Sequence, residues 1–185
     1  MLVVGIAGDP GIGKTTLVRE LMGNPSGWEQ RKQGLVLYHI QESTRRLIVG
    51  RYEAGQTFGG TDRLSMAAAP AALSYLAAFA KVCPRWRILF EGDRLMSASF
   101  IRSVSEITKN AHWFALRASE ATLAERRAGR GSNQNATWLK GRSRKVANLI
   151  ESRDIDVIPL PYDTPAECVA AKQRIGRLFA CEDVA

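Results

Sequence analysis

Eight residues near the start of the chain have the types and spacing of a phosphate-binding loop. The segment GDPGIGKT matches the pattern G-x-x-x-x-G-K-[ST] at every fixed position. Its glycines allow successive backbone N–H groups to turn toward an anion, the lysine adds positive charge at the β- and γ-phosphates, and the threonine hydroxyl is a ligand for Mg²⁺. We therefore expect a nucleoside triphosphate with Mg²⁺ to bind at Gly8, Asp9, Pro10, Gly11, Ile12, Gly13, Lys14, Thr15 and Thr16.

The flanking residues provide the context that such a loop requires. Leu2 to Ala7 is an apolar run typical of a buried strand, and an amphipathic helix is expected from Lys14 to about Met22. The helix would direct its N-terminal dipole at the same phosphates. A simple glycine-rich turn would not account for the lysine and threonine that end the motif.

Acidic residues follow a second apolar segment. Residues 87–90 predict a central strand, and Glu91 and Asp93 come directly after it. In a fold built on a phosphate loop, the strand beside the first one ends next to the Mg²⁺ site, so Glu91 is expected to be the carboxylate of that site, either as a direct Mg²⁺ ligand or in contact with the groups that bind the ion. Asp93 is a candidate general base toward an acceptor hydroxyl. The alternatives for Asp93 are a pair with Arg94 or a cap on the following helix.

Two further acids are candidates for the acceptor site. Asp62 lies between Thr61 and Arg63 after a loop with three glycines, where the backbone can approach a ligand closely. It is expected either to contact the acceptor or to cap the helix that follows, and the two roles are compatible. Glu42 comes just after the predicted second strand and is a third acid expected near the acceptor.

Most of the positive charge is concentrated in one stretch. The chain has a formal net charge of +8, and residues 125–145 contain seven basic residues against the single acid Glu125. Arg126 and Arg130 are expected to reach the transferring phosphate and Arg127 the nucleotide, because phosphoryl transfer depends on cations around the moving group. Gly129 and Gly131 would be hinges. The alternative is a solvated basic helix face.

The residues after these arginines are suited to a nucleic acid or a nucleoside. A polar string at 132–135 offers hydrogen-bonding side chains, of which Asn133 and Asn135 are candidate substrate contacts. Trp138, Lys140 and Arg142 then combine an aromatic ring with positive charge, the pairing by which unpaired bases are often held. The alternative is that Trp138 packs the helix onto the rest of the protein.

The order of the expected elements predicts an α/β three-layer sandwich with a mainly parallel sheet and helices on both faces. We expect one domain over residues 1–185, with a mobile basic lid at about 120–145. The remaining expected elements are strands at 35–40, 47–52, 112–116 and 157–160, helices at 64–82, 97–108, 119–128, 136–152 and 165–179, and a loop at 24–34.

Other classes of protein are disfavoured by composition. The apolar run at the N-terminus predicts a strand rather than a signal peptide, and the run at 66–80 is too short and too rich in alanine to span a membrane. The three cysteines, Cys83, Cys168 and Cys181, have no metal-binding spacing, so free thiols in the cytoplasm are expected. His39 and His112 are expected to be structural.

Three segments together resemble the nucleoside and nucleotide kinase branch of the P-loop proteins. They are GDPGIGKTT, ILFEGDR and the arginine-rich stretch. More narrowly, TFGGTDRLSM, EGDRL and NQNATWLKGRSRKVANL resemble phage P-loop kinases of thymine hypermodification. That resemblance implies an ATP- and Mg²⁺-dependent enzyme, acting in the host cytoplasm, that phosphorylates 5-hydroxymethyluracil in DNA. It also implies acceptor and metal contacts from residues 60–63 and 91–94, including Arg94.

Two other functions are compatible with the same motifs. A free-nucleotide kinase of thymidylate type would share the loop, but thymidylate kinases have an aromatic residue after the Asp-Arg pair, where this chain has Leu95. A nucleotide-dependent switch would need no acceptor, and the acids after the central strand and the arginine-rich stretch disfavour it.

Overall fold

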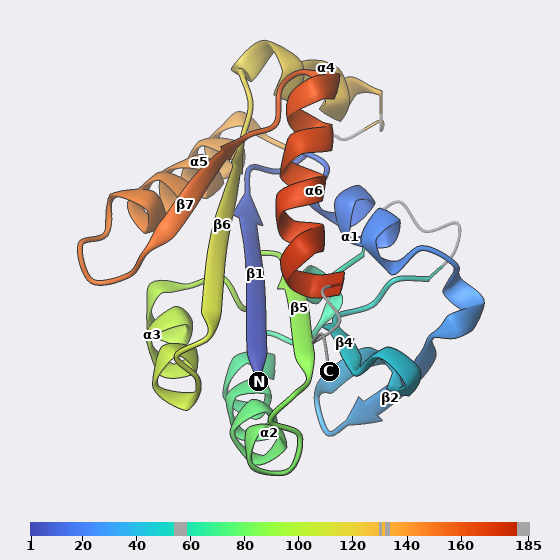
Figure 1. Cartoon of the computed structure of the whole chain (residues 1–185). Coiled ribbons are helices and arrows are strands. Elements are labelled where there is room, and N and C mark those ends of the chain that lie inside the picture. The colour runs from blue at the N-terminus through green and yellow to red at the C-terminus, as the bar shows by residue number, and fades with distance from the viewer. Residues whose placement is uncertain (54–58, 130, 132–133, 181–185) are drawn as a thin grey trace.

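The structure, a computed structural model, describes residues 1–53, 59–129, 131 and 134–180. Within these residues the chain forms a seven-stranded sheet in the order β2-β3-β4-β5-β1-β6-β7 (Figure 1). The predicted α/β fold with a mainly parallel sheet is confirmed. The strands are β1 (Leu2–Gly8), β2 (Glu29–Gln33), β3 (Val36–Gln41), β4 (Arg46–Val49), β5 (Arg87–Glu91), β6 (Ala111–Arg117) and β7 (Val157–Pro161).

The first strand lies at the centre of the sheet. It is parallel to β5 on one side and to β6 on the other, with Ile6 beside Glu91 and Gly8 beside Leu116. The carboxyl ends of parallel strands meet at one edge of a sheet, so the residues after β1 and β5 come together there. Their near-continuous apolar sequences suit strands that are buried on both faces.

The part of the sheet formed by β2, β3 and β4 differs from the prediction. Residues 24–34, expected to be a loop, contain the short 3₁₀ helix η1 (Pro25–Gly27) and strand β2. Strand β2 reads EQRKQ, is mostly exposed, and pairs antiparallel with β3, which in turn pairs antiparallel with β4. A polar edge strand has no hydrophobic alternation, and the sequence pattern therefore gave no sign of it.

Helices cover both faces of the sheet. Helices α1 and α6 lie in front of it in Figure 1, and α2, α3 and α5 pack against the other face. Helix α2 begins at Ala68 rather than at the predicted 64, because Thr61–Arg63 forms the 3₁₀ turn η3 and Leu64 is extended. Proline at position 70 is tolerated there because it lies in the first turn. The helices are α1 (Lys14–Met22), α2 (Ala68–Val82), α3 (Ala98–Ile107), α4 (Glu120–Ala128), α5 (Ala136–Glu151) and α6 (Pro165–Ala180).

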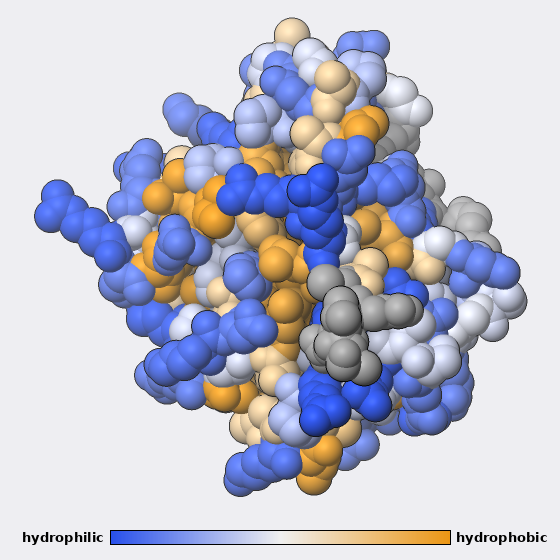
Figure 2. Space-filling model, viewed as in Figure 1, coloured by the Kyte–Doolittle hydropathy of each residue, from blue (hydrophilic) through white to orange (hydrophobic). Residues whose placement is uncertain are grey.

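Two hydrophobic clusters fill the space between the sheet and these helices. Figure 2 shows hydrophobic side chains beside α6, over β6 and β7, where a shallow hollow is lined by residues that include Phe114, Ile158 and Leu178. Cys83 and Cys168 are free thiols, and Cys181 lies outside the described residues. In the described part of the chain, no helix combines the length and hydrophobicity needed to cross a membrane.

Candidate active site

The phosphate loop connects β1 to α1 and depends on glycine for its shape. Gly11 and Gly13 have φ angles of 88° and 107°, which favour residues without a side chain. A Cβ atom at Gly11 would also lie 2.7 Å from the Arg127 side chain. Ile12 is fully buried among the hydrophobic residues below the loop, so its side chain anchors the loop and only its backbone remains available to a phosphate.

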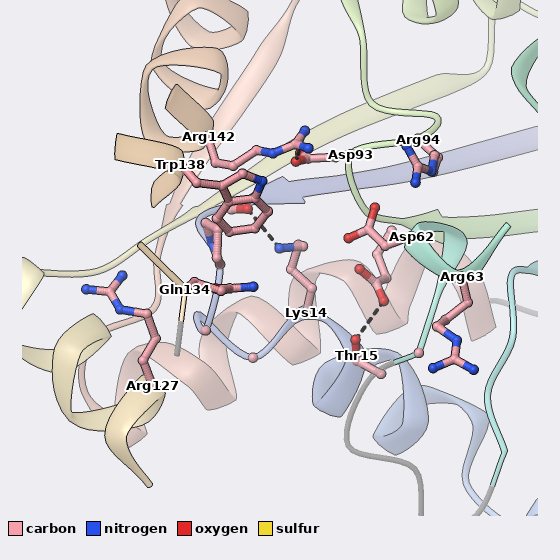
Figure 3. A pocket seen from close by; sticks show the side chains of 16 residues that line it. Lys14, Thr15, Asp62, Arg63, Asp93, Arg94, Arg127, Gln134, Trp138 and Arg142 are labelled. Carbon is pink, nitrogen blue, oxygen red and sulfur yellow. Dashed lines mark hydrogen bonds and ion pairs between the residues drawn. The ribbon is translucent and has the colours of Figure 1, made fainter. Parts of the chain in front are cut away.

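Lys14 is at the start of α1 and extends over the loop. Its Nζ atom donates hydrogen bonds to the carbonyl oxygens of Gly8 at 2.8 Å and Asp9 at 3.2 Å. Figure 3 shows the ammonium group below the Trp138 ring, in the pocket that the drawn side chains line. The loop thus presents a positive charge and a helix N-terminus to the same space, the arrangement that binds the phosphates of a nucleotide.

Thr15 and Glu91 meet across the ends of α1 and β5. The Thr15 hydroxyl donates to Glu91 Oε1 at 2.9 Å. Glu91 is 1% exposed, and burial, the largest influence, raises the pKa of its carboxyl to about 7, although Lys14 acts in the opposite direction. A hydroxyl and a buried carboxylate side by side are oxygen ligands that suit Mg²⁺, which usually takes one or two carboxylates together with phosphate oxygens and water.

The segment from Gly59 to Arg63 covers this pair of residues. A Cβ atom at Gly60 would lie 2.0 Å from Glu91 Oε1, so only glycine allows the backbone to approach the carboxylate this closely. Thr61 was a predicted substrate contact. Its hydroxyl instead donates to the Glu91 carbonyl at 2.7 Å and its side chain is fully buried, so it fastens this segment to β5.

Asp62 and Asp93, the two carboxylates predicted to face an acceptor, both line the cavity above the phosphate loop. They differ in their partners. Asp93 pairs with Arg142 of α5, with 2.7 Å between Oδ2 and Nη1, and lies 3.9 Å from Lys145 Nζ. It neither pairs with Arg94 nor caps α3, whose N-cap is Ser97. Asp62 lies within the turn η3 and does not cap α2, which begins six residues later.

Helix α5 contributes the opposite wall of the cavity. Trp138 and Arg142 line it, and the Arg142 guanidinium lies 5.0 Å from the centre of the Trp138 ring. Asn135 was predicted to contact substrate, but its side chain accepts a hydrogen bond from the Trp138 backbone N–H at 2.7 Å and caps the helix. Lys140 is exposed and is not part of the lining, since a position two residues from Trp138 projects from another side of the helix.

The two arginines that end α4 have different positions. Arg127 lines the cavity and pairs with Glu120. Arg126 was predicted to reach the transferring phosphate, but its guanidinium donates to the carbonyls of Ile12 and Tyr162, each at 2.9 Å. It therefore ties the phosphate loop to the end of β7 and does not line the cavity. Arg130 and Asn133, the other predicted contacts of this stretch, lie outside the described residues.

The prediction that Glu42 lies near the acceptor is wrong. Because β3 is antiparallel to β4, its last residue Gln41 pairs with Arg46, the first residue of β4. Arg46 in turn lies beside Arg87, the first residue of β5. Glu42 is therefore at the edge of the sheet opposite the phosphate loop, where it pairs with Arg31 at 2.9 Å.

Together these elements enclose a cavity of about 360 Å³, which is within the usual size range of small-molecule sites. Two residues predicted to contact the nucleotide, Asp9 and Thr16, are not part of the lining. The Asp9 side chain is buried, with its Oδ2 atom 3.9 Å from Arg117 Nη1, and Thr16 is exposed. The prediction also missed Gln134, whose only sequence signal was its place in the polar string. The lining is Gly8, Pro10, Gly11, Gly13, Lys14, Thr15, Gly59, Asp62, Arg63, Glu91, Asp93, Arg94, Arg127, Gln134, Trp138 and Arg142.

Comparison with known proteins gives matches at the level of structure. No protein-family model matches the chain, and no curated protein matches it. A gluconokinase from Sinorhizobium meliloti 1021 is similar, with a TM-score of 0.52 and 13% identity, over 95% of this chain and 94% of that one. An unliganded sugar kinase from Janibacter sp. HTCC2649 is also similar, with a TM-score of 0.54 and 14% identity, over 97% of this chain and 96% of that one. The chain therefore has the same fold as these two kinases.

Proposed function

We propose that the protein is an ATP-dependent kinase that transfers the γ-phosphate to the hydroxymethyl group of 5-hydroxymethyluracil in DNA. One observation carries this proposal: the phosphate loop, the Thr15–Glu91 pair and two acceptor-side aspartates line a single cavity whose far wall is the Trp138 ring. The similar solved structures are kinases, one a gluconokinase and one a sugar kinase, which supports an alcohol as the acceptor.

The chain's own residues have distinct tasks in this reaction. The loop amides and Lys14 hold the triphosphate, and Asp62 or Asp93 accepts the proton of the acceptor hydroxyl. The hydroxymethyl oxygen forms a bond to the γ-phosphorus, the bond from that phosphorus to the β,γ-bridging oxygen breaks, and ADP leaves. Mg²⁺ held by Thr15 and Glu91 would supply positive charge at the phosphates.

The acceptor side of the cavity supports a base as the group that enters. The Trp138 ring offers a face on which a pyrimidine can stack, and Arg63 and Arg94 supply positive charge on the side of the cavity that faces it (Figure 3). A base inside a duplex must leave the stack to reach a cavity of this kind, at a cost of a few kcal/mol. The basic residues around the opening would offset part of that cost by contacts with the DNA backbone.

Labelled ATP tests the proposal when it is offered with four acceptors in parallel. These are DNA containing 5-hydroxymethyluracil, DNA of the same sequence with thymine, free pyrimidine nucleotides, and gluconate. We expect label in the first DNA alone. Label in free nucleotides would instead make the protein a thymidylate-type kinase, label in gluconate would make it a sugar-acid kinase, and release of free phosphate alone would make it a nucleotide switch.

Two lysine variants provide the control for this assay. Lys14→Ala removes the cation at the β- and γ-phosphates, and we expect it to lower transfer at least 100-fold. Lys32→Ala is the matched change on the exposed edge strand β2, distant from the cavity, and should leave transfer unchanged. If both variants retained full transfer, the activity would not belong to this site.

A further inference from the structure

Three residues of the cavity form a continuous chain of contacts. Asp93 follows β5, whereas Arg142 and Trp138 are four residues apart on α5 and so share one side of the helix. The Arg142 guanidinium is 2.7 Å from the Asp93 carboxylate and 5.0 Å from the centre of the Trp138 ring. Figure 3 shows the guanidinium beside Asp93 and the indole ring projecting over Lys14.

A second contact joins Asp93 to the same helix. Lys145 Nζ donates to the Asp93 carbonyl at 2.8 Å and lies 3.9 Å from its Oδ1 atom. Lys145 is one turn beyond Arg142, so both cations reach Asp93 from one side of α5. The carboxylate is only 21% exposed, and it is therefore held by two positive charges in a partly desolvated position. The Asp93 carboxylate is thus already engaged by Arg142 and Lys145 of α5.

Asp62 is in a different situation in the same cavity. Within the described residues, its carboxylate takes part in no hydrogen bond or ion pair, and Figure 3 shows it pointing toward the space above Lys14. It lies close to the backbone of Gly92, since a Cβ atom added there would be 2.9 Å from Asp62 Oδ1. Of the two acceptor-side aspartates, Asp62 is thus the one with a carboxylate available to a substrate hydroxyl.

We infer that Asp93 is a positioning residue: through Arg142 it holds the Trp138 ring as the wall against which the acceptor base stacks. The proton acceptor is then Asp62. The inference rests on the proposed function for the identity of the acceptor, but the contacts between Asp93, Arg142 and Trp138 do not depend on it. The two claims can therefore fail separately.

A fluorescence experiment tests the positioning without ATP or an acceptor. The signal of Trp138 is obtained by subtracting the emission of the Trp138→Phe variant from that of the unchanged chain, and acrylamide quenching then reports its exposure. We expect Asp93→Asn, measured against its own Trp138→Phe reference, to raise the quenching constant at least 2-fold. Asp62→Asn, the same chemical change in the same cavity, should leave the constant unchanged.

Equal quenching in the Asp93→Asn variant and the unchanged chain would overturn the inference. Circular dichroism confirms that each variant is folded. If Asp93→Asn does not fold, Arg142→Gln replaces it, because this residue lies on a helix surface and its substitution breaks the same chain of contacts. Arg142→Gln is then expected to give the same increase in quenching, and the absence of that increase would overturn the inference equally.

Steady-state kinetics with 5-hydroxymethyluracil DNA separate the two aspartates. We expect Asp93→Asn to raise KM for the DNA about 10-fold with kcat within 3-fold of the unchanged chain, since it disturbs binding more than chemistry. Arg142→Gln should raise KM by a similar factor. The double variant should have a KM no higher than that of either single variant, because both substitutions break the same ion pair between Arg142 and Asp93. Asp62→Asn should lower kcat at least 100-fold.

An effect of Asp93→Asn on kcat rather than on KM would contradict the assignment of Asp93 as a positioning residue. If Asp93→Asn lowered kcat 100-fold at an unchanged KM, Asp93 would be the proton acceptor. If the unchanged chain transferred no phosphate to any DNA, the proposed function would fail, whereas the quenching measurement would still decide whether Asp93 positions Trp138.

Discussion

Thr15 and Glu91 are 76 residues apart in the sequence, and the hydroxyl of one donates to the carboxylate of the other over 2.9 Å. This hydrogen bond joins the first turn of α1 to the end of β5. It exists because β1 and β5 are adjacent and parallel, so that the phosphate loop and the acid-bearing strand end reach the same edge of the sheet. The proposed metal site is thus a direct consequence of the strand order.

The Thr15 hydroxyl can be removed with little change of shape. We expect Thr15→Val to lower phosphate transfer at least 10-fold and to raise the Mg²⁺ concentration needed for half-maximal activity, because one oxygen ligand is lost. Thr15→Ser keeps the hydroxyl and should retain most of the activity. Identical Mg²⁺ titrations of the Val and Ser variants would show that the hydroxyl is not a metal ligand.

The close approach of Gly60 to Glu91 predicts a large effect of a single methyl group. Gly60 has φ 78° and ψ −158°, a region essentially restricted to glycine, and its added Cβ would collide with Glu91 Oε1. We expect Gly60→Ala to lower the free energy of unfolding by roughly 3 kcal/mol or more and to impair transfer.

Gly34 provides the control for this substitution. Its φ angle of 58° is also positive, but nothing lies within 4 Å of an added Cβ. Gly34→Ala should therefore lower the free energy of unfolding by only about 1 kcal/mol, because of the backbone conformation alone, and leave phosphate transfer intact. Urea denaturation of the two variants measures the difference, and equal losses of stability would contradict the contact with Glu91.

The buried carboxyl of Glu91 predicts a pH dependence of stability. Its pKa is raised from 4.5 to about 7, mainly by burial. Between these two values the folded protein retains a proton that the unfolded chain has released. The contribution of Glu91 to the free energy of unfolding is therefore at its maximum below about pH 4.5. It is lost as the pH rises to and through 7, and the total loss is about 3 kcal/mol.

Comparison with Glu91→Gln isolates this contribution, because glutamine does not titrate. The comparison also cancels the opposite effect of His39, whose pKa is lowered by burial. Urea denaturation at several pH values from 4 to 8 should show the advantage of the glutamine variant growing as the pH rises. Parallel stability curves for the two proteins would contradict the raised pKa.

An exposed arginine at the rim of the cavity is expected to contact the DNA backbone. Arg63 is exposed and lines the opening, so Arg63→Ala should weaken DNA binding and reduce the slope of log K against log salt by about one unit. Arg85→Ala makes the same change before β5, at the opposite edge of the sheet, and should alter neither quantity. Equal salt slopes for both variants would exclude Arg63 from the interface.

Much of the fold and the phosphate site was predictable from the sequence. The motif from Gly8 to Thr15 is local, and the hydrophobic pattern of the central strands depends on burial that every residue of the strand shares. The meeting of Glu91 with Thr15 followed from the rule that neighbouring parallel strands end at the same edge. These features need no knowledge of contacts that are distant in the sequence.

The errors have a common physical origin. Because β3 is antiparallel to β4, Glu42 lies at the end of the sheet opposite the phosphate loop. The polar edge strand β2 has no hydrophobic pattern from which the antiparallel part of the sheet could have been predicted. Asn135 serves its own helix as a cap, and the guanidinium of Arg126 is bound by backbone carbonyls. Charge and composition indicate that a residue is polar, but only the folded backbone determines which partner it meets.

The basic stretch illustrates the same limit within one element. The sequence grouped Trp138, Lys140 and Arg142 as one surface. In the helix, Trp138 and Arg142 turn toward the cavity, whereas Lys140 is exposed outside it. The ion pair between Arg142 and Asp93 joins residues from different elements, and no spacing in the sequence predicts it.

Identification of the phosphorylated atom tests the central claim most directly. DNA containing 5-hydroxymethyluracil, with both ends blocked, is incubated with the protein and ATP, digested to mononucleotides by nucleases without a phosphatase, and analysed by mass spectrometry. We expect a deoxynucleotide that carries a second phosphomonoester, on its 5-hydroxymethyl group, formed by the unchanged chain and not by Lys14→Ala. Only the 5-hydroxymethyl-2′-deoxyuridine monophosphate without that second group in both digests, with ATP intact, would contradict the proposed function.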